Sequence, residues 1–176
     1  MARPERGDVT ILSLTAEYAL RAVVHLARQG EAAALQAQDL ADATGVPQSY
    51  LRKILHELVR AGVLASTRGK GGGFTLAVPP SRLTLLAVVS RFDGVAPSRR
   101  CLLGRIECSD QDPCPVHDRW KVVAEEVAAF FRETTLADVL ADESARRGRE
   151  RPKARQKPGN RPKKTPRRRP QEARDE

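Results

Sequence analysis

The chain has 176 residues, enough for one compact domain and an appendage. Its formal net charge of +9 is unevenly spread, because 14 of the 31 Lys and Arg residues but only six of the 22 Asp and Glu residues lie after residue 141. The opening MARPERGDVT has no apolar run, and no stretch approaches the roughly 18 apolar residues of a membrane span. We therefore expect a cytoplasmic protein without a membrane partner.

The first half of the chain has the pattern of a helix-turn-helix. An amphipathic helix is predicted at 14–28 with Thr15 as its N-cap, followed by a short helix at 38–44 that ends at Gly45, and by another that begins at Pro47. Two short helices joined at a glycine are typical of this motif, whose second helix presents its N-terminal end to base edges and phosphates. The residues predicted to contact DNA from that helix are Gln48, Ser49, Tyr50, Arg52 and Lys53.

The segment after this helix predicts a β-hairpin. Residues 63–67 and 74–77 have strand character and are joined by RGKGGG, in which Gly71 allows close approach to DNA and Arg68 and Lys70 can contact phosphates. An isolated loop of this kind would be a plain surface turn, but its position after a helix-turn-helix favours a DNA-binding wing. No phosphate-binding glycine motif of a nucleotide site is matched.

A long helix is predicted from residue 115 to about residue 134. It carries an apolar face that little else in one subunit could cover, so a second copy is expected, and a two-fold dimer suits a palindromic DNA site. Packing of this helix on the chain's own head is the alternative. The residues of the apolar face are Trp120, Val123, Val127 and Phe130.

The predicted fold class is mainly α with a small β-wing, arranged as a winged helix-turn-helix head followed by a long dimerisation helix. We expect an N-terminal extension at 1–11, the DNA-binding domain at 12–98, the cysteine loop with the dimerisation helix at 99–141, and a basic disordered tail at 142–176. The tail contains five prolines and, as its aliphatic residues, only three alanines, too few to bury a core. It could add salt-sensitive DNA affinity or serve only for solubility.

The chain's three cysteines and a nearby histidine, Cys101, Cys108, Cys114 and His117, are spaced C-x6-C-x5-C-x2-H. Thiolates are soft ligands suited to zinc or to an iron–sulfur cluster, with imidazole as a natural fourth partner. Structural zinc in a Cys3His set is the main alternative, although such sites usually include a tighter cysteine pair. A metal-free thiol switch is also open. A catalytic pair of Cys114 and His117 lacks an accompanying oxyanion-hole motif, so we expect no enzyme.

With these motifs in order, residues 12–141 resemble the Rrf2 family of bacterial transcriptional regulators, of the IscR/NsrR type. The resemblance rests on LTAEYALRAVVHLA, PQSYLRKILHELVRAGVLASTRGKGGGFTLA, the three cysteines and TTLADVL. The family's usual interval between the first two cysteines is five residues, and here it is six.

The resemblance implies a homodimer that binds palindromic promoter DNA and holds a two-iron or four-iron cluster, and we expect this regulator to act as a repressor. Redox change, nitric oxide or cluster loss would alter its DNA affinity. Cys101, Cys108 and Cys114 are the implied thiolate ligands and His117 the fourth, with Glu17 of a partner subunit as the alternative. A general nucleic-acid-binding protein with a structural zinc site is the competing hypothesis.

Overall fold

The computed structural model describes residues 11–30, 32–69, 71–93, 101–105 and 109–150. Of residues 148–150 it describes the backbone only. None of the described helices is long and apolar enough to cross a membrane. In chain order the elements are α1 (Leu14–Arg28), α2 (Ala37–Thr44), α3 (Gln48–Arg60), β1 (Leu64–Thr67), β2 (Gly73–Leu76), the short 3-10 helix η1 (Pro80–Arg82), α4 (Leu85–Val89), α5 (His117–Glu133) and α6 (Leu136–Glu150).

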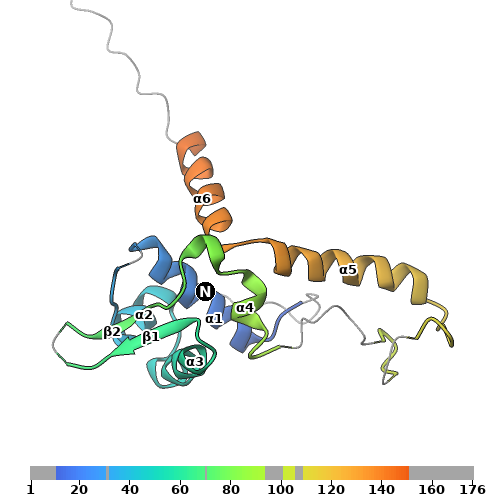
Figure 1. Ribbon diagram of the computed structural model, residues 1–176, viewed down its shortest axis with the longest axis horizontal. Helices are drawn as coiled ribbons and strands as arrows, with labels where there is room; N and C mark the ends of the chain where they lie inside the picture. The colour runs from blue at the N-terminus through green and yellow to red at the C-terminus, as the bar shows by residue number, and fades with distance from the viewer. Residues whose placement is uncertain (1–10, 31, 70, 94–100, 106–108, 151–176) are drawn as a thin grey trace, which may run out of the picture.

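These elements form a compact head from which two helices extend. Helices α1 to α4 and the β1–β2 hairpin make the head, α5 projects from it to one side, and α6 leaves in a different direction (Figure 1). The structure is thus mainly helical with one two-stranded antiparallel sheet, which confirms the predicted fold class.

Helix α1 is the central element of the head and contacts α2, α3, α4 and α6. Its N-cap is Ser13, whose side chain accepts the N–H of Ala16, and not Thr15 as the sequence predicted. The hydroxyl of Thr15 is instead paired with Tyr50 on α3. The α1 residues in the main core are Ala19, Ala22, Val23, Leu26 and Ala27.

Helices α2 and α3, with the turn between them, form the predicted helix-turn-helix. Gly45 has a left-handed conformation, with φ of +69°, that ends α2 and that residues with a side chain seldom adopt. Val46 is buried beside it, and Pro47 occupies the N-cap position of α3. The apolar stripe of α3 packs into the main core and consists of Leu51, Ile54, Leu55 and Leu58.

The hairpin is held against the head through Leu35, the residue just before the N-cap of α2. Leu35 pairs with Phe74 of β2 by two backbone hydrogen bonds of 2.8 and 3.1 Å. This isolated antiparallel bridge ties the hairpin to the segment that precedes α2. A Cβ atom at Gly73 would lie 2.6 Å from the carbonyl oxygen of Leu35. Only glycine therefore allows the two backbones to come this close.

We expect Gly73→Ala to lower the free energy of unfolding by about 1–3 kcal/mol, because the added methyl group must displace the backbone of Leu35. Chemical denaturation followed by circular dichroism measures this. The control is Ser66→Ala, at an exposed position of β1, which should change the free energy by less than about 0.5 kcal/mol. Equal stability of the two variants would contradict the close contact at the base of the wing.

The C-terminal half of helix α5 packs against the head. Phe131 packs with Leu85 and Val89 of α4 and with Ala16 of α1. The buried stripe of α5 includes Ala124, Ala128 and Phe131, whereas two members of the predicted apolar face, Val123 and Phe130, are 49% and 56% exposed. The periodicity correctly indicated an amphipathic helix, but it did not separate the packed stripe from the exposed one.

The chain after α5 departs from the prediction. TTLADVL does not close the long helix but starts a new one, because Thr134 is extended and its carbonyl accepts the N–H of Leu85. Leu136 is fully buried, and its N–H donates to the carbonyl of Leu83. Asp138 accepts from both the N–H and the hydroxyl of Thr135, which lowers the pKa of this carboxyl and caps α6.

The predicted start of disorder at Asp142 is therefore wrong for residues 142–150, which belong to α6. Leu136 and Leu140 attach the beginning of the helix to the main core, and an ion pair between Glu143 and Arg28 of α1 extends the attachment. Composition gave no sign of these tertiary contacts. Residues 151–176 of the predicted tail lie outside the described residues.

Candidate nucleic-acid interface and metal centre

The N-terminal end of α3 presents polar side chains at the surface of the head. Ser49, Arg52 and Lys53 are exposed, and Gln48 is half-buried. Tyr50 differs from its neighbours, because its hydroxyl lies 2.6 Å from the hydroxyl of Thr15 on α1.

The ring of Tyr50 also packs edge-on against Tyr18 of α1, at 6.0 Å between centroids. The tyrosine is therefore held against α1, and it anchors the start of α3 there. Of the five residues predicted on this helix, Ser49, Arg52 and Lys53 are the best placed to reach a ligand, because Tyr50, although 38% exposed, is held against α1.

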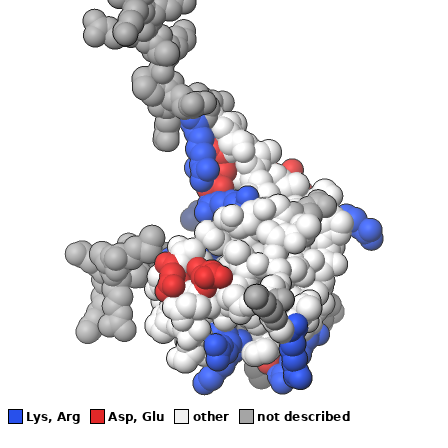
Figure 2. Space-filling view, turned by 90° about the vertical axis from the view of Figure 1, so that its left-hand side faces the viewer, with Lys and Arg blue, Asp and Glu red and all other residues white. Residues whose placement is uncertain are grey.

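The wing adds a second polar element beside α3. Arg68 follows β1 directly and is exposed, and Gly71 has a φ of +81° that favours glycine. Lys70, predicted to contact phosphate, lies outside the described residues. Figure 1 places α3 at the bottom of the head, and Figure 2 shows lysine and arginine side chains gathered along the same lower edge.

Three residues that follow α4 contact the head just before the chain that leads to the cysteines. Arg91 pairs with Glu57 of α3 at 2.7 Å, and the hydrogen bond that it donates is the main reason that the pKa of Glu57 is lowered. Asp93 accepts the N–H of Ser13, the N-cap of α1, at 2.6 Å. Phe92 packs against both hydrophobic clusters of the head.

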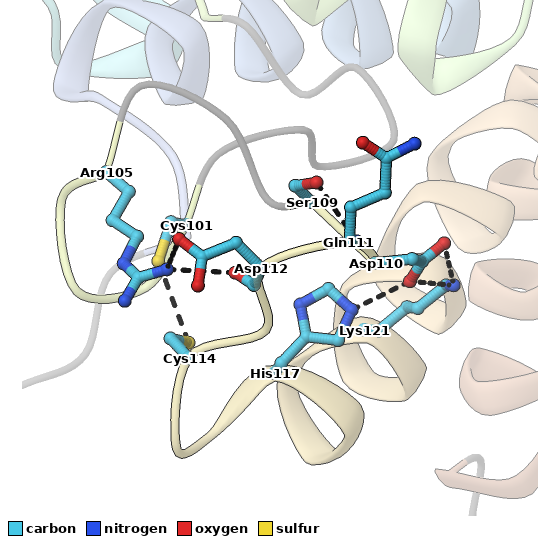
Figure 3. A network of polar contacts seen from close by, with 9 residues as sticks. All are labelled: Cys101, Arg105, Ser109, Asp110, Gln111, Asp112, Cys114, His117 and Lys121. Carbon is cyan, nitrogen blue, oxygen red and sulfur yellow. Dashed lines mark hydrogen bonds and ion pairs between the residues drawn. The ribbon is translucent and has the colours of Figure 1, made fainter.

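Two of the three cysteines lie together at the far end of α5. Cys101 and Cys114 are each 7% exposed, and their sulfur atoms are 3.8 Å apart (Figure 3). Backbone N–H groups of Arg105 and Leu103 donate to the sulfur of Cys101 and lower the pKa of its thiol, and Cys114 and the charge of Arg105 act in the same direction. The metal-binding thiolate form is thereby favoured.

The separation of the two sulfurs fits a shared metal ion. Two thiolates on one tetrahedral metal, at bonds of about 2.3 Å, are about 3.8 Å apart. Cys101 and Cys114 match this spacing, which suits one iron of a cluster or a zinc ion equally. Within the described residues no group of three or more His, Cys, Asp or Glu side chains is arranged to hold a metal, and the third cysteine, Cys108, falls outside them.

His117 is the first residue of α5 and is 4% exposed. Its Nε2 atom lies 2.8 Å from Oδ1 of Asp110, a residue that the sequence analysis did not select. Asp110 also accepts from Nζ of Lys121 at 2.7 and 2.9 Å. The one feature of the sequence that could have drawn attention to Asp110 is its position between two candidate cysteine ligands, Cys108 and Cys114.

Glu17, the alternative fourth ligand, lies in the first turn of α1 and pairs with Arg21 at 3.6 Å. Figure 1 shows α1 inside the head and the first turn of α5 at the end remote from it. Within one subunit, Glu17 therefore belongs to a different part of the structure from the start of α5, beside which the two described cysteines lie.

Comparison with known proteins identifies transcriptional regulators. Residues 12–142 match the family model Rrf2, described as an iron-dependent transcriptional regulator. An HTH-type transcriptional regulator of Aquifex aeolicus (strain VF5) is 33% identical over 132 residues, which cover 74% of this chain and 91% of that protein. The HTH-type transcriptional regulator IscR of Serratia proteamaculans (strain 568) is 29% identical over 129 residues, covering 73% of this chain and 78% of the relative.

Solved structures share the fold at lower sequence identity. IscR of T. potens superimposes with a TM-score of 0.62 at 22% identity, over 76% of this chain and 88% of that one. CymR (YrzC), the global cysteine regulator of B. subtilis, superimposes with a TM-score of 0.65 at 21% identity, over 76% and 98%. The fold of the head and of the following helix is thus a recurrent one.

Proposed function

Because the chain belongs to the Rrf2 family of transcriptional regulators, we propose that it is a promoter-binding repressor whose DNA affinity depends on an iron–sulfur cluster. The observation that carries the proposal is the pair of buried thiols, Cys101 and Cys114, at tetrahedral-metal spacing in a chain that also has a winged helix-turn-helix. The IscR relatives support the same function, and the family consists of regulators rather than enzymes.

A homodimer is part of the proposal. Val122, Val123 and Phe130 on α5 are between 49% and 60% exposed, although all three are large and apolar. A second copy of α5 is the partner that would cover them and would place two recognition helices on a palindromic site.

The residues proposed to hold the cluster are Cys101, Cys108, Cys114 and His117, with Glu17 of the partner subunit as the alternative to the histidine. The buried thiol pair suits one iron of a two-iron cluster, and this favours that form over a four-iron cluster, in which each cysteine binds a separate iron. When bound, the cluster supplies a group that oxidants or nitric oxide can alter.

Two contacts made by residues that precede the cysteine segment in the chain support gating. Arg91 contacts α3 through Glu57, and Asp93 contacts the N-cap of α1. Both residues immediately precede the chain that leads to Cys101. A change in the cysteine segment could therefore shift α3 through Arg91 and α1 through Asp93, and the spacing of the recognition helices in a dimer is sensitive to such shifts.

The experiment that tests the function is an absorption spectrum of protein purified without oxygen, with iron, acid-labile sulfide and zinc assayed on the same sample. Iron and sulfide together, with a promoter affinity that changes on cluster removal, support the proposal. Stoichiometric zinc and weak sequence discrimination would favour the second candidate, a general nucleic-acid-binding protein with a structural zinc, for which the same 3.8 Å sulfur spacing is suitable.

The wing offers a separate test of the DNA-binding surface. We expect Arg68→Ala to weaken binding to promoter and unrelated DNA alike and to reduce the slope of log K against log salt by about 1, because one phosphate contact is lost. Arg82→Ala, at an exposed position of η1, is the matched control and should leave the slope unchanged. An unaltered slope for Arg68→Ala would exclude the wing from the DNA interface.

A further inference from the structure

Asp110 joins two side chains that α5 presents on one face. His117 and Lys121 are four residues apart on that helix, and both contact the carboxylate of Asp110 (Figure 3). His117 is 4% exposed, whereas the side chain of Asp110 is 70% exposed. A surface carboxylate, anchored by a lysine, therefore holds a buried imidazole at the edge of the cysteine segment.

The hydrogen bond decides which ring nitrogen carries the proton. An ionised carboxylate can only accept, so Nε2 of His117 must donate to Oδ1 of Asp110. In the neutral ring the lone pair then belongs to Nδ1. Figure 3 shows Nδ1 on the side of the ring that faces the cysteines in that view, away from Asp110.

Metal-bound histidines commonly donate their other ring N–H to a carboxylate, which fixes both tautomer and orientation. We infer that Asp110 is a positioning residue that turns His117 so that Nδ1 is its metal-binding nitrogen. The inference rests on the proposed cluster function, which assigns His117 as a ligand. It adds a residue outside the cysteine–histidine motif and names the ligating atom.

The first arm of the test uses metal-free protein with ¹⁵N-labelled histidine and detects ring N–H protons by NMR. A proton on Nε2 of His117 should be visible, because its bond to Asp110 slows exchange with water; its loss in His117→Gln assigns it. Asp110→Ala should abolish the signal, and Asp110→Asn should retain it, because the amide oxygen still accepts. The control is Asp118→Ala, which removes an exposed carboxylate from the first turn of α5, the turn that also holds His117, and it should leave the signal intact.

The second arm uses protein with a reduced cluster and histidine labelled with ¹⁵N either at Nδ1 alone or, in a separate sample, at Nε2 alone. Pulsed EPR should show the strong coupling of a directly bound nitrogen in the sample labelled at Nδ1. Asp110→Ala should weaken this coupling, because part of the population then binds through Nε2 or loses the histidine, whereas Asp110→Asn should retain it.

The outcomes separate this inference from the proposed function. Strong coupling to Nε2 in the wild-type protein, or no coupling to either ring nitrogen, would overturn the positioning role while leaving the cluster in place. A protein without iron and sulfide would contradict the proposed function, and the ring proton of the first arm would still decide whether Asp110 orients His117. A proton found on Nδ1, or a signal that survives in Asp110→Ala, overturns the inference.

Discussion

Cys114→Ala is expected to abolish iron and sulfide binding while leaving the DNA-binding head folded. Its sulfur is one of the two that lie at the spacing of a shared tetrahedral metal, and the side chain is buried where Cys101 is its partner. Removing it leaves a metal with an incomplete set of ligands, a larger loss than the 10–100-fold expected when only a supporting residue is removed. The alanine lies at the remote end of α5, outside both hydrophobic clusters of the head.

Iron, sulfide and the visible spectrum of anaerobically purified protein measure this effect, and the thermal transition checks the fold. Ser109→Ala, in the same segment, is the matched control and should keep wild-type iron and sulfide. In Cys114→Ala, and equally in Cys108→Ala, promoter affinity should stop responding to oxidant and nitric oxide. A Cys114→Ala protein with a normal cluster content would refute the assignment of this thiol as a ligand.

The helix-turn-helix could be predicted because its determinants are local. Gly45 ends α2 through its own backbone conformation, and the apolar stripe of α3 repeats with the period of a helix. The wing was recognisable for a similar reason, since its strands flank a glycine-rich tip. The need for glycine at position 73, by contrast, arises from the backbone of Leu35, which is distant in the sequence. The local sequence pattern around Gly73 could not predict this contact.

The misjudged regions depend on contacts between distant segments. Leu136 is buried because the chain returns to the head beside Leu83, so α6 continues into a stretch that composition alone assigned to disorder. Asp110 contacts His117 across a turn without helical or strand periodicity. Sequence spacing identified the candidate ligands here, but not the residue that orients one of them.

Arg52→Ala is expected to reduce affinity for the promoter site by about 10- to 100-fold, which corresponds to about 1–3 kcal/mol for a lost contact to a base edge. Arg52 is exposed next to Leu51, whose buried side chain fixes α3 on the head, so the substitution should not disturb the fold. Because a base contact carries sequence information, affinity for unrelated DNA should fall much less, and the ratio of specific to non-specific binding should fall with it.

Binding titrations at fixed salt, with promoter and scrambled duplexes, measure this ratio. Arg60→Ala is the matched control, since Arg60 is an exposed arginine at the opposite end of α3 that pairs with Glu57. Its removal should change promoter affinity by less than about twofold, within the small energy of a surface ion pair. An equal loss on both duplexes for Arg52→Ala would make Arg52 a phosphate contact and would leave base reading to Ser49 and Lys53, two further exposed polar side chains at the start of α3.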